Sequence, residues 1–437
     1  MFRRNVITFV LLVLIVQFTF GVYLLGQRRG GGSRADFYHH VSHFGTVLEI
    51  VRERYVDDSV DYESLTRAAI NGMLNSLDPH SELLIASKFE DLRSHTAQEY
   101  GGIGVQIERR DDRITVIAPI AGTPGEEAGI MPGDQIIRVD GKNTERMNLD
   151  EIVQLLRGKP RTSVTITLHR PQSGEILEKT ITRQVIQVDS VRDTRMLEDG
   201  IGYVRITQFG ERTGKELAAA LDQLETEGLR ALVLDLRNNP GGLLTASVDV
   251  AEQFFNRGEL IVYTQGRDER SRWESRAGRG ARGFNYPLAV LINSGSASAS
   301  EIVAGALSDT RRAVLVGETS FGKGSVQSIE QLRNGEALRL TTAFYHTPAG
   351  KVIHERGVEP DIVIELPFEE EVNLRLQRNR PATETAAEFE ERFGFPRVED
   401  RQLEAAVEAL RGTFLFSEKH QNDRRLAEVP GAEAALP

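Results

Sequence analysis

The sequence predicts a multidomain α/β protein, and three observations support this prediction. The chain of 437 residues is too long for one typical domain and corresponds to about three. Hydrophobic residues make up 40% of it and charged residues 27%, close to soluble globular averages, which excludes a multi-span membrane protein and a wholly disordered one. Between residues 191 and 366, short apolar strand patterns alternate with helical patterns, as in β–α crossover units with a mostly parallel sheet.

Composition also limits the possible partners. The formal net charge of −11 argues against nucleic acid, because neutralising phosphates requires clustered Lys and Arg. The sequence contains no cysteine, which excludes disulfides, thiolate nucleophiles and Cys-ligated metals. His39 and His43 are spaced for one helical face, but no carboxylate motif accompanies them. We therefore expect no cofactor and no metal.

The N-terminus predicts a membrane anchor. Val6 to Leu25 is a run of 20 residues without a charge, and it follows Arg3 and Arg4. A helix of this length crosses a bilayer core of about 30 Å. No small-residue cleavage site follows the run, which favours an uncleaved signal anchor in residues 1–29 over a cleaved signal peptide. We expect the rest of the chain on the extracytoplasmic side, periplasmic or at the cell surface, although the arginines after the run weaken the positive-inside signal.

Residues 34–98 are predicted to form a helical region after the glycine-rich linker Gly30 to Ser33. Apolar residues recur at three- and four-residue spacing from Phe37 to Val51 and again from Leu65 to Leu77. Such a stripe packs into a core more often than against a second subunit. A homodimer through the terminal helices stays open as the second possibility.

Residues 99–188 have the pattern of a β-rich module. The string Gly129–Gly141, GIMPGDQIIRVDG, resembles the central signature of a PDZ domain, in which residues 149–156 would form the groove helix. A glycine-rich stretch leaves backbone N–H groups available for a peptide carboxylate while the peptide adds a strand to the sheet. The alternative is a module whose glycines only form turns. The predicted peptide-binding residues are Gly101, Gly102, Ile103 and Gly104, and the predicted partners are protein C-termini.

Two turns of residues 189–366 lead from a strand into a helix and carry unusual residues. Residues 235–242 end in Gly241-Gly242, whose N–H groups can point at an anion with a helix N-terminus behind them. Residues 293–301 are rich in hydroxyls, and the N–H of Ala299, next to Ser298, is free to face a developing oxyanion. Such turns cluster at the carboxyl ends of parallel strands. The simpler interpretation is a serine N-cap in an ordinary loop.

Lys323 lies between two glycines just after the next predicted strand. Residues 317–323 also match the P-loop pattern G-x-x-x-x-G-K. However, Gly324 occupies the position that needs Ser or Thr, and a strand rather than a helix is predicted from Val326 to Leu332. Nucleotide binding is therefore not favoured.

Together these motifs resemble the C-terminal processing peptidases, also called tail-specific proteases. The matching stretches are SASASEIVAGAL at 296–307, FGKG at 321–324, LDPHS at 77–81, DLRNNPGG at 235–242 and GVEPD at 357–361. They cover nearly the whole chain after the anchor, and the match is loosest at residues 268–283, which leaves substrate contacts there open.

The resemblance implies a serine endopeptidase core of crotonase-like ββα fold that works through an acyl-enzyme. It implies that Ser298 is the nucleophile, Lys323 the general base and Gln327 the residue that positions the lysine. The implied oxyanion donors are N–H groups of Ala299 and of Gly241 or Gly242.

The chemistry of the residues agrees with this assignment. A serine hydroxyl needs an adjacent base, and a lysine at its usual pKa of about 10.4 cannot serve until desolvation lowers that pKa. A Ser-His-Asp arrangement could draw on His346 or His354 with Asp235 or Asp309, but no G-x-S-x-G elbow is present. The competing function is a non-enzymatic membrane scaffold with a peptide-binding PDZ domain.

Residues 367–437 form a charged tail rich in Ala and Glu, with weak helical periodicity. We expect either a helical dimerisation element or a partly disordered segment.

Overall fold

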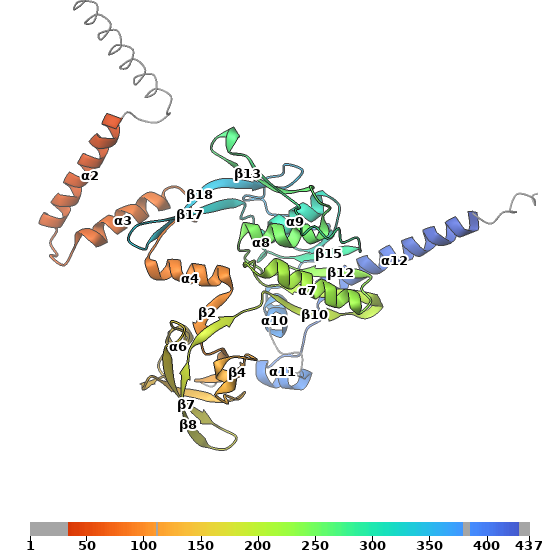
Figure 1. Ribbon diagram of the computed structural model, residues 1–437, viewed down its shortest axis with the longest axis horizontal. Helices are drawn as coiled ribbons and strands as arrows, with labels where there is room; N and C mark the ends of the chain where they lie inside the picture. Colours follow the sequence, from red (N-terminus) through yellow and green to blue (C-terminus); the bar gives the residue numbers. More distant parts are fainter. Residues whose placement is uncertain (1–33, 111, 379–384, 428–437) are drawn as a thin grey trace, which may run out of the picture. The chain divides into compact units, whose positions relative to one another are not determined.

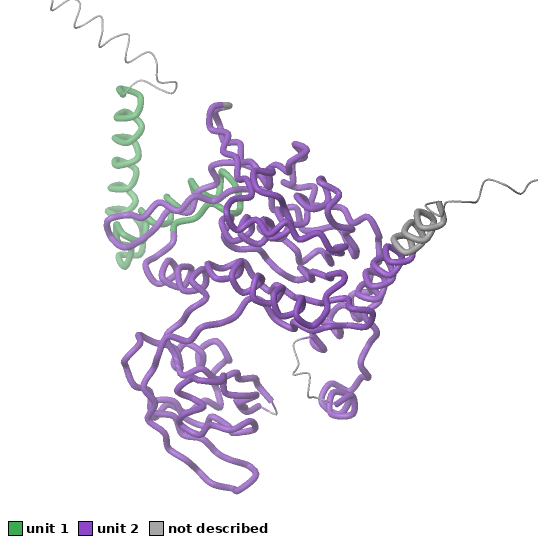
Figure 2. Tube along the Cα trace, turned by 45° about the vertical axis from the view of Figure 1, so that its right-hand side comes forward, with its two compact units in different colours: residues 1–83 green, residues 84–437 purple. Residues whose placement is uncertain are grey.

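The computed structural model describes residues 34–110, 112–378 and 385–427 (Figure 1). The chain divides into two compact units, Met1–Leu83 and Leu84–Pro437 (Figure 2). The predicted anchor, Val6 to Leu25, lies outside the described residues. Within the described ranges, no helix is long and apolar enough to span a bilayer.

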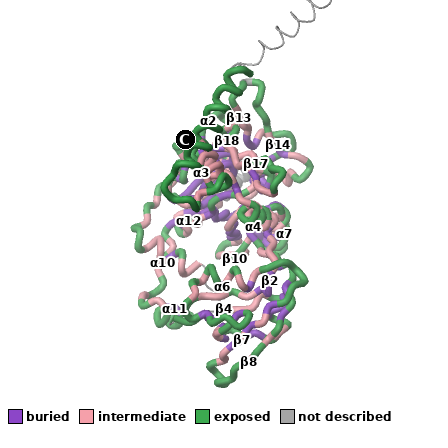
Figure 3. Tube along the Cα trace, turned by 90° about the vertical axis from the view of Figure 1, so that its left-hand side faces the viewer, coloured by how far each residue is buried: buried purple, intermediate pink, exposed green. Residues whose placement is uncertain are grey.

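The first unit contains two helices, α2 (Arg34–Arg54) and α3 (Tyr62–Asn75). Asp61 caps α3 by accepting a hydrogen bond from the Ser64 N–H at 2.6 Å, which explains where this helix begins. No residue of α2 is buried, and its apolar stripe is exposed from 37% at Val51 to 63% at Phe37 (Figure 3). Within the first unit, no other described element buries this stripe.

The second unit begins at Leu84, the last residue of the short strand β1 (Glu82–Leu84). Helix α4 (Ala86–Ala97) and the β-rich module follow. Strand β2 (Glu99–Gly102) pairs antiparallel with β9 (Gln184–Gln187), so the chain enters and leaves the module along one two-stranded ribbon. At its base, the Gln98 side chain accepts from the Arg212 N–H at 2.8 Å.

Between these two strands lies an antiparallel sheet in the order β3-β4-β5-β7-β8, with β6 beside β5. Its helix α6 (Leu149–Leu156) has the predicted bounds and begins with a reciprocal capping box of Asn148 and Glu151. Ile152 and Leu156 of this helix pack into the core of the module. The other elements are β3 (Val105–Arg110), β4 (Arg113–Pro119), α5 (Pro124–Glu127), β5 (Gln135–Val139), β6 (Lys142–Asn143), β7 (Ser163–Arg170) and β8 (Glu175–Thr182).

The larger α/β core is built on a six-stranded sheet in the order β10-β11-β12-β15-β16-β19. All neighbours from β11 to β19 are parallel, and only β10 runs antiparallel to β11. The middle strands are continuous apolar runs because both of their faces are covered. The strands are β10 (Val191–Met196), β11 (Ile201–Ile206), β12 (Ala231–Asp235), β15 (Leu288–Ile292), β16 (Val314–Gly317) and β19 (Ile362–Val363).

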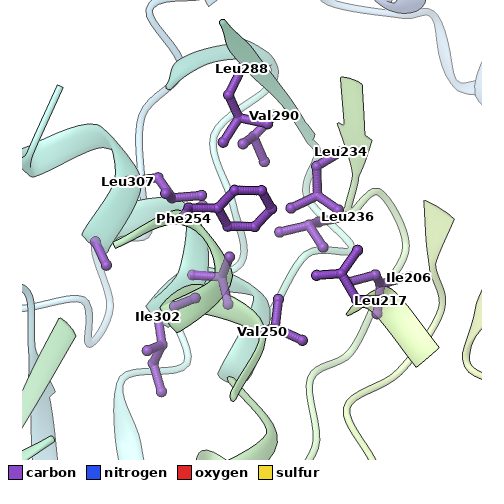
Figure 4. Close-up of a cluster of buried hydrophobic side chains, with 14 of the residues drawn as sticks. Ile206, Leu217, Leu234, Leu236, Val250, Phe254, Leu288, Val290, Ile302 and Leu307 are labelled. Carbon is purple, nitrogen blue, oxygen red and sulfur yellow. The ribbon is translucent and has the colours of Figure 1, made fainter. Parts of the chain in front are cut away.

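Helices cover both faces of this sheet. On one face, side chains of α7 (Thr213–Thr226), α8 (Leu244–Ala251) and α9 (Ala299–Asp309) pack on the strands, with Phe254 at the centre of the close-up (Figure 4). Helix α8 is followed directly by a 3₁₀ turn, Glu252–Phe254. On the other face, Ala406 and Leu410 pack against strand residues of β11, β12 and β15.

A second, antiparallel sheet includes β13 (Leu260–Gly266), β14 (Trp273–Arg276), β17 (Ser325–Gln331) and β18 (Ala337–His346). The strand expected from Val326 is thus present as β17. It directly follows the loop of Lys323, so no helix begins there as a P-loop would need.

The C-terminal residues form α10 (Phe368–Arg378), α11 (Ala386–Phe393) and α12 (Arg401–Ala427). The described part of this segment is helical, and α12 packs on the core. Leu403, Ala406, Val407 and Leu410 of this helix belong to the apolar cluster on the second face of the sheet. The spacing of these four residues is helical, and the charges between them obscured it.

Candidate active site

The two unusual turns meet at the carboxyl ends of the neighbouring strands β12 and β15. The Asn238 N–H donates to Asn293 Oδ1 at 2.8 Å, and the Asn239 carbonyl accepts both the Ala297 N–H (3.0 Å) and the Ser300 hydroxyl (2.9 Å). These bonds hold residues 238–242 against the start of α9, the arrangement expected of a ligand site in an open α/β sheet.

Ser298 is the N-cap of α9 and has an unusual backbone. Its φ of +55° and ψ of −111° are sparsely populated by residues other than glycine, and such strain collects at functional sites. Its neighbours Ala297 and Ala299 are buried, whereas Ser298 itself is partly exposed. The Ser298 side chain is thus accessible to solvent between two buried neighbours.

The phenol of Tyr345, on β18, lies close enough to the Ser298 hydroxyl for the two groups to interact. Tyr345 is 5% exposed, and burial raises its pKa to about 12, so the phenol stays neutral at working pH. Sequence analysis missed Tyr345, because nothing near it in the sequence distinguishes it from other strand tyrosines.

Gly241, with a φ of +99°, lies against this serine, and Gly242, with a φ of +150°, lies against the backbone of Phe209. A Cβ on Gly241 would stand 2.8 Å from Ser298 Cβ and 2.9 Å from Ala299 N, so only glycine permits this close approach. The Gly241 N–H is already bound to Asn239 Oδ1 at 2.9 Å. Within the described part of the chain, the N–H groups of Gly242 and Ala299 have no acceptor, which leaves these two for an oxyanion.

Lys323 occupies the loop between β16 and β17 and is partly buried. Burial lowers the pKa of its amine, the positive charge of Arg339 on β18 lowers it further, and Glu301 opposes the shift. The net direction favours the neutral amine, the form that a general base needs.

The structure does not join the three predicted catalytic side chains by hydrogen bonds. The amide of Gln327 donates to Ser325 Oγ at 2.8 Å and to Thr341 Oγ1 at 3.4 Å. Over the described ranges, no hydrogen bond links the Lys323 amine to Ser298 or to Gln327. Catalytic hydrogen bonds are often long without substrate, so the roles of all three residues stay predictions.

The histidine alternative finds no support in the geometry. Asp235 is paired with Arg237 at 2.7 Å, and Asp309 is paired with Lys351 at 2.8 Å. His346 stacks on the ring of Tyr263 with centroids 4.7 Å apart. Neither aspartate has a histidine partner among the described residues, so neither forms part of a Ser-His-Asp arrangement here.

A buried ionic network supports the strand end beneath the oxyanion turn. The Arg237 guanidinium donates to Asp235 at 2.7 Å, to Asp400 at 2.7 and 2.8 Å, and to Gln402 at 3.0 Å. Burial raises the pKa of Asp235, but the positive charges of Arg237 and Arg378 and the hydrogen bonds to the carboxylate outweigh it, so the net pKa lies below the usual range. The start of α12 is thereby tied to the turn that carries Gly241.

A groove lies where the PDZ resemblance predicts one. A cavity of about 180 Å³ is bordered by Gly102, Ile103 and Gly104 and, on the facing helix α6, by Val153 and Leu156. Gly101 does not border it. That residue pairs with Val185 in the β2–β9 ribbon, and its carbonyl accepts the Gly158 N–H at 3.0 Å.

Comparison with known proteins agrees with this organisation. Residues 200–364 match the model of peptidase family S41, and residues 115–170 match that of the PDZ domain. A carboxy-terminal-processing protease of Bartonella bacilliformis is 42% identical over 366 residues, which are 82% of this chain and 83% of that protein. A carboxyl-terminal-processing protease of Synechocystis sp. is 41% identical over 325 residues, 73% of this chain and 75% of that protein.

Among solved structures, a photosystem II D1 C-terminal processing protease is 32% identical, with a TM-score of 0.43, over 74% of this chain and 92% of that one. The family matches confirm the predicted PDZ domain and the predicted serine peptidase. The chain therefore belongs to the carboxy-terminal processing serine proteases of peptidase family S41.

Proposed function

We propose that this protease binds protein C-termini in the groove of its PDZ domain and cleaves the bound chain with a Ser298–Lys323 dyad. One observation carries the proposal. The strained, partly exposed Ser298 precedes Ala299, and among the described residues the N–H groups of Ala299 and of Gly242 in the facing turn have no acceptor. The backbone of Lys323 shares the Glu301 carboxylate with Ser298, and the pKa of its amine is lowered. Nucleophile, oxyanion donors and base are thus available in one site.

The reaction follows from these groups. Neutral Lys323 takes the proton of the Ser298 hydroxyl as Oγ attacks the scissile carbonyl, and the oxyanion is stabilised by the N–H groups of Gly242 and Ala299. The lysine then gives the proton to the leaving amine. The fragment that begins with this amine is released, and the fragment on the carbonyl side stays attached to Ser298 as an acyl-enzyme. A water molecule, deprotonated by the same lysine, attacks that ester, and the lysine returns the proton to Ser298 Oγ as the acyl group leaves as a carboxylate. Gln327 positions the amine, and Tyr345 holds the hydroxyl until substrate arrives.

Hydrolysis of an unfolded protein tests this function. We expect the chain without residues 1–29 to degrade casein, and we expect Ser298→Ala to reduce the rate by about 10⁴-fold or more. Gel analysis over time and circular dichroism of both proteins give the rate and the fold. Equal degradation by folded Ser298→Ala would contradict the assignment, and absence of degradation by both would favour the non-enzymatic scaffold.

Recognition of a C-terminus makes a separate prediction. In the Ser298→Ala background, which prevents cleavage, a fluorescent peptide with a free carboxylate should bind at least about tenfold more tightly than its C-terminal amide, since charge-assisted hydrogen bonds contribute about 1.5–3 kcal/mol. Fluorescence polarisation measures both affinities. Equal affinities would show that the groove of Gly102 to Gly104 does not select a carboxylate.

We also infer a location and an assembly for the protein from its N-terminal segment. The uncharged run Val6 to Leu25 supports a membrane anchor with an extracytoplasmic peptidase. The exposed apolar stripe of α2, from Phe37 to Val51, supports a homodimer in which this stripe meets a second copy.

A further inference from the structure

The carboxylate of Glu301, in the first turn of α9, is fully buried at 0% exposure. Its Oε2 accepts the N–H groups of Ser298 and Lys323, both at 2.8 Å. Its Oε1 accepts the Gly322 N–H at 2.7 Å and the Ser320 hydroxyl at 2.5 Å. One side chain thus bonds directly to the backbone of the nucleophile and to the backbone of the base.

This arrangement exceeds what helix capping requires. In a capping box, the glutamate accepts only the N-cap N–H, here that of Ser298. Glu301 also binds a loop 22 residues further along the chain. Ser320 extends the connection, because its hydroxyl accepts the Val358 N–H at 2.7 Å. A buried carboxylate is costly unless it is well hydrogen-bonded, and four donors offset that cost.

We propose that Glu301 is a positioning residue that fixes the Ser298 turn and the Lys323 loop relative to one another. The inference rests on the proposed Ser298–Lys323 dyad. The two catalytic groups come from different elements, and no side-chain hydrogen bond joins them in the described structure. The shared carboxylate therefore supplies a link that the side chains themselves lack, and a misplacement of about 1 Å at a reacting group can cost about 100-fold in rate.

The charge of Glu301 adds an effect that can be measured separately. Burial lowers the pKa of Lys323, and two charged groups face this amine. The charge of Arg339 on β18 lowers the Lys323 pKa further, and the charge of Glu301 on α9 raises it. The backbones of His354 and Tyr345 lie against the adjacent Gly324. Loss of the Glu301 charge should lower the Lys323 pKa further. The acid limb of the pH–rate profile should then move to lower pH.

Two variants separate geometry from charge. Glu301→Gln keeps the size of the side chain but loses the charge and turns one acceptor into a donor. We expect kcat to fall about 10- to 100-fold and the acid limb of the pH–rate profile to move to lower pH. Glu301→Asp keeps the charge but is one methylene too short to reach both segments, so kcat should fall without that shift. Glu388→Gln is the matched control, because Glu388 forms a capping box with Thr385 on α11.

The assay is hydrolysis of labelled casein from pH 5 to 10, with Ser298→Ala and Lys323→Arg run in parallel and melting temperatures measured for all variants. Wild-type rates in both folded Glu301 variants would overturn the inference, as would a loss in Glu301→Gln with an unmoved acid limb. If Glu301→Gln does not fold, the rate of Glu301→Asp decides. Activity in folded Lys323→Arg would instead show that the dyad itself is wrong.

Discussion

Lys323→Arg should reduce casein hydrolysis by about 10⁴-fold or more, close to the loss in Ser298→Ala. Arginine stays protonated at any working pH, so this change keeps the positive charge and removes the base. Rates of the two single variants and of the double variant, measured with proteins of equal melting temperature, test the assignment. Because the two groups act as a unit, the double variant should be little slower than either single one.

The pH dependence of the wild-type enzyme completes this test. Burial, followed by the charge of Arg339, lowers the pKa of Lys323, so the amine is neutral at a lower pH than an ordinary lysine. Activity should be present above the pKa of Lys323 and should fall as the pH drops through it. A folded Lys323→Arg variant that keeps most of its rate would rule out lysine as the base.

Arg237→Met should lower the free energy of unfolding of the core by about 3–5 kcal/mol, because it leaves the buried Asp235 carboxylate without its closest cationic partner and with Arg378 alone at 3.3 Å. The side chains of Asp235 and Arg237 are both fully buried, and that of Asp400 is 15% exposed. Urea denaturation followed by circular dichroism measures the change. The matched control is Arg276→Met, whose half-exposed ion pair with Glu274 should contribute only about 0–1 kcal/mol.

The same network has a defined pH dependence. The folded pKa of Asp235 lies below its unfolded value, so its contribution to stability is present above the unfolded value of about 4 and is lost as the pH falls towards the folded one. Arg237→Met should weaken this acid sensitivity, since it removes the largest attraction that lowers the pKa. A loss of stability no larger than that of Arg276→Met would mean that other groups hold the turn.

The features that the sequence predicted correctly are those determined by residues close together in the chain. The apolar runs of β12 and β15, the glycines at Gly241 and Gly242 and the lysine between glycines each specify a strand, a close approach or a loop within a few residues. The strand ends also placed the two turns correctly at one edge, because parallel strands share that edge.

Contacts across the fold were not predictable in this way. Tyr345 reaches Ser298 from a strand of a different sheet, and no neighbouring residue indicates that its phenol points there. Asp400 pairs with Arg237 although the sequence between them contains most of the core. Glu301 carried a partial signal, because Ser298 and Glu301 have capping-box spacing, but that spacing alone could not show that the carboxylate also binds Lys323.

The β2–β9 ribbon makes the PDZ domain an insertion within the peptidase chain. Glu99 and Gln187 are direct partners in this ribbon, so the two points at which the domain joins the rest of the protein lie side by side. A peptidase core with adjoining attachment points can accept, lose or exchange a recognition module during evolution without a change in its own path. Because only the two strands β2 and β9 connect the PDZ domain to the peptidase core, substrate recognition in the one and the chemistry of Ser298 in the other can change independently.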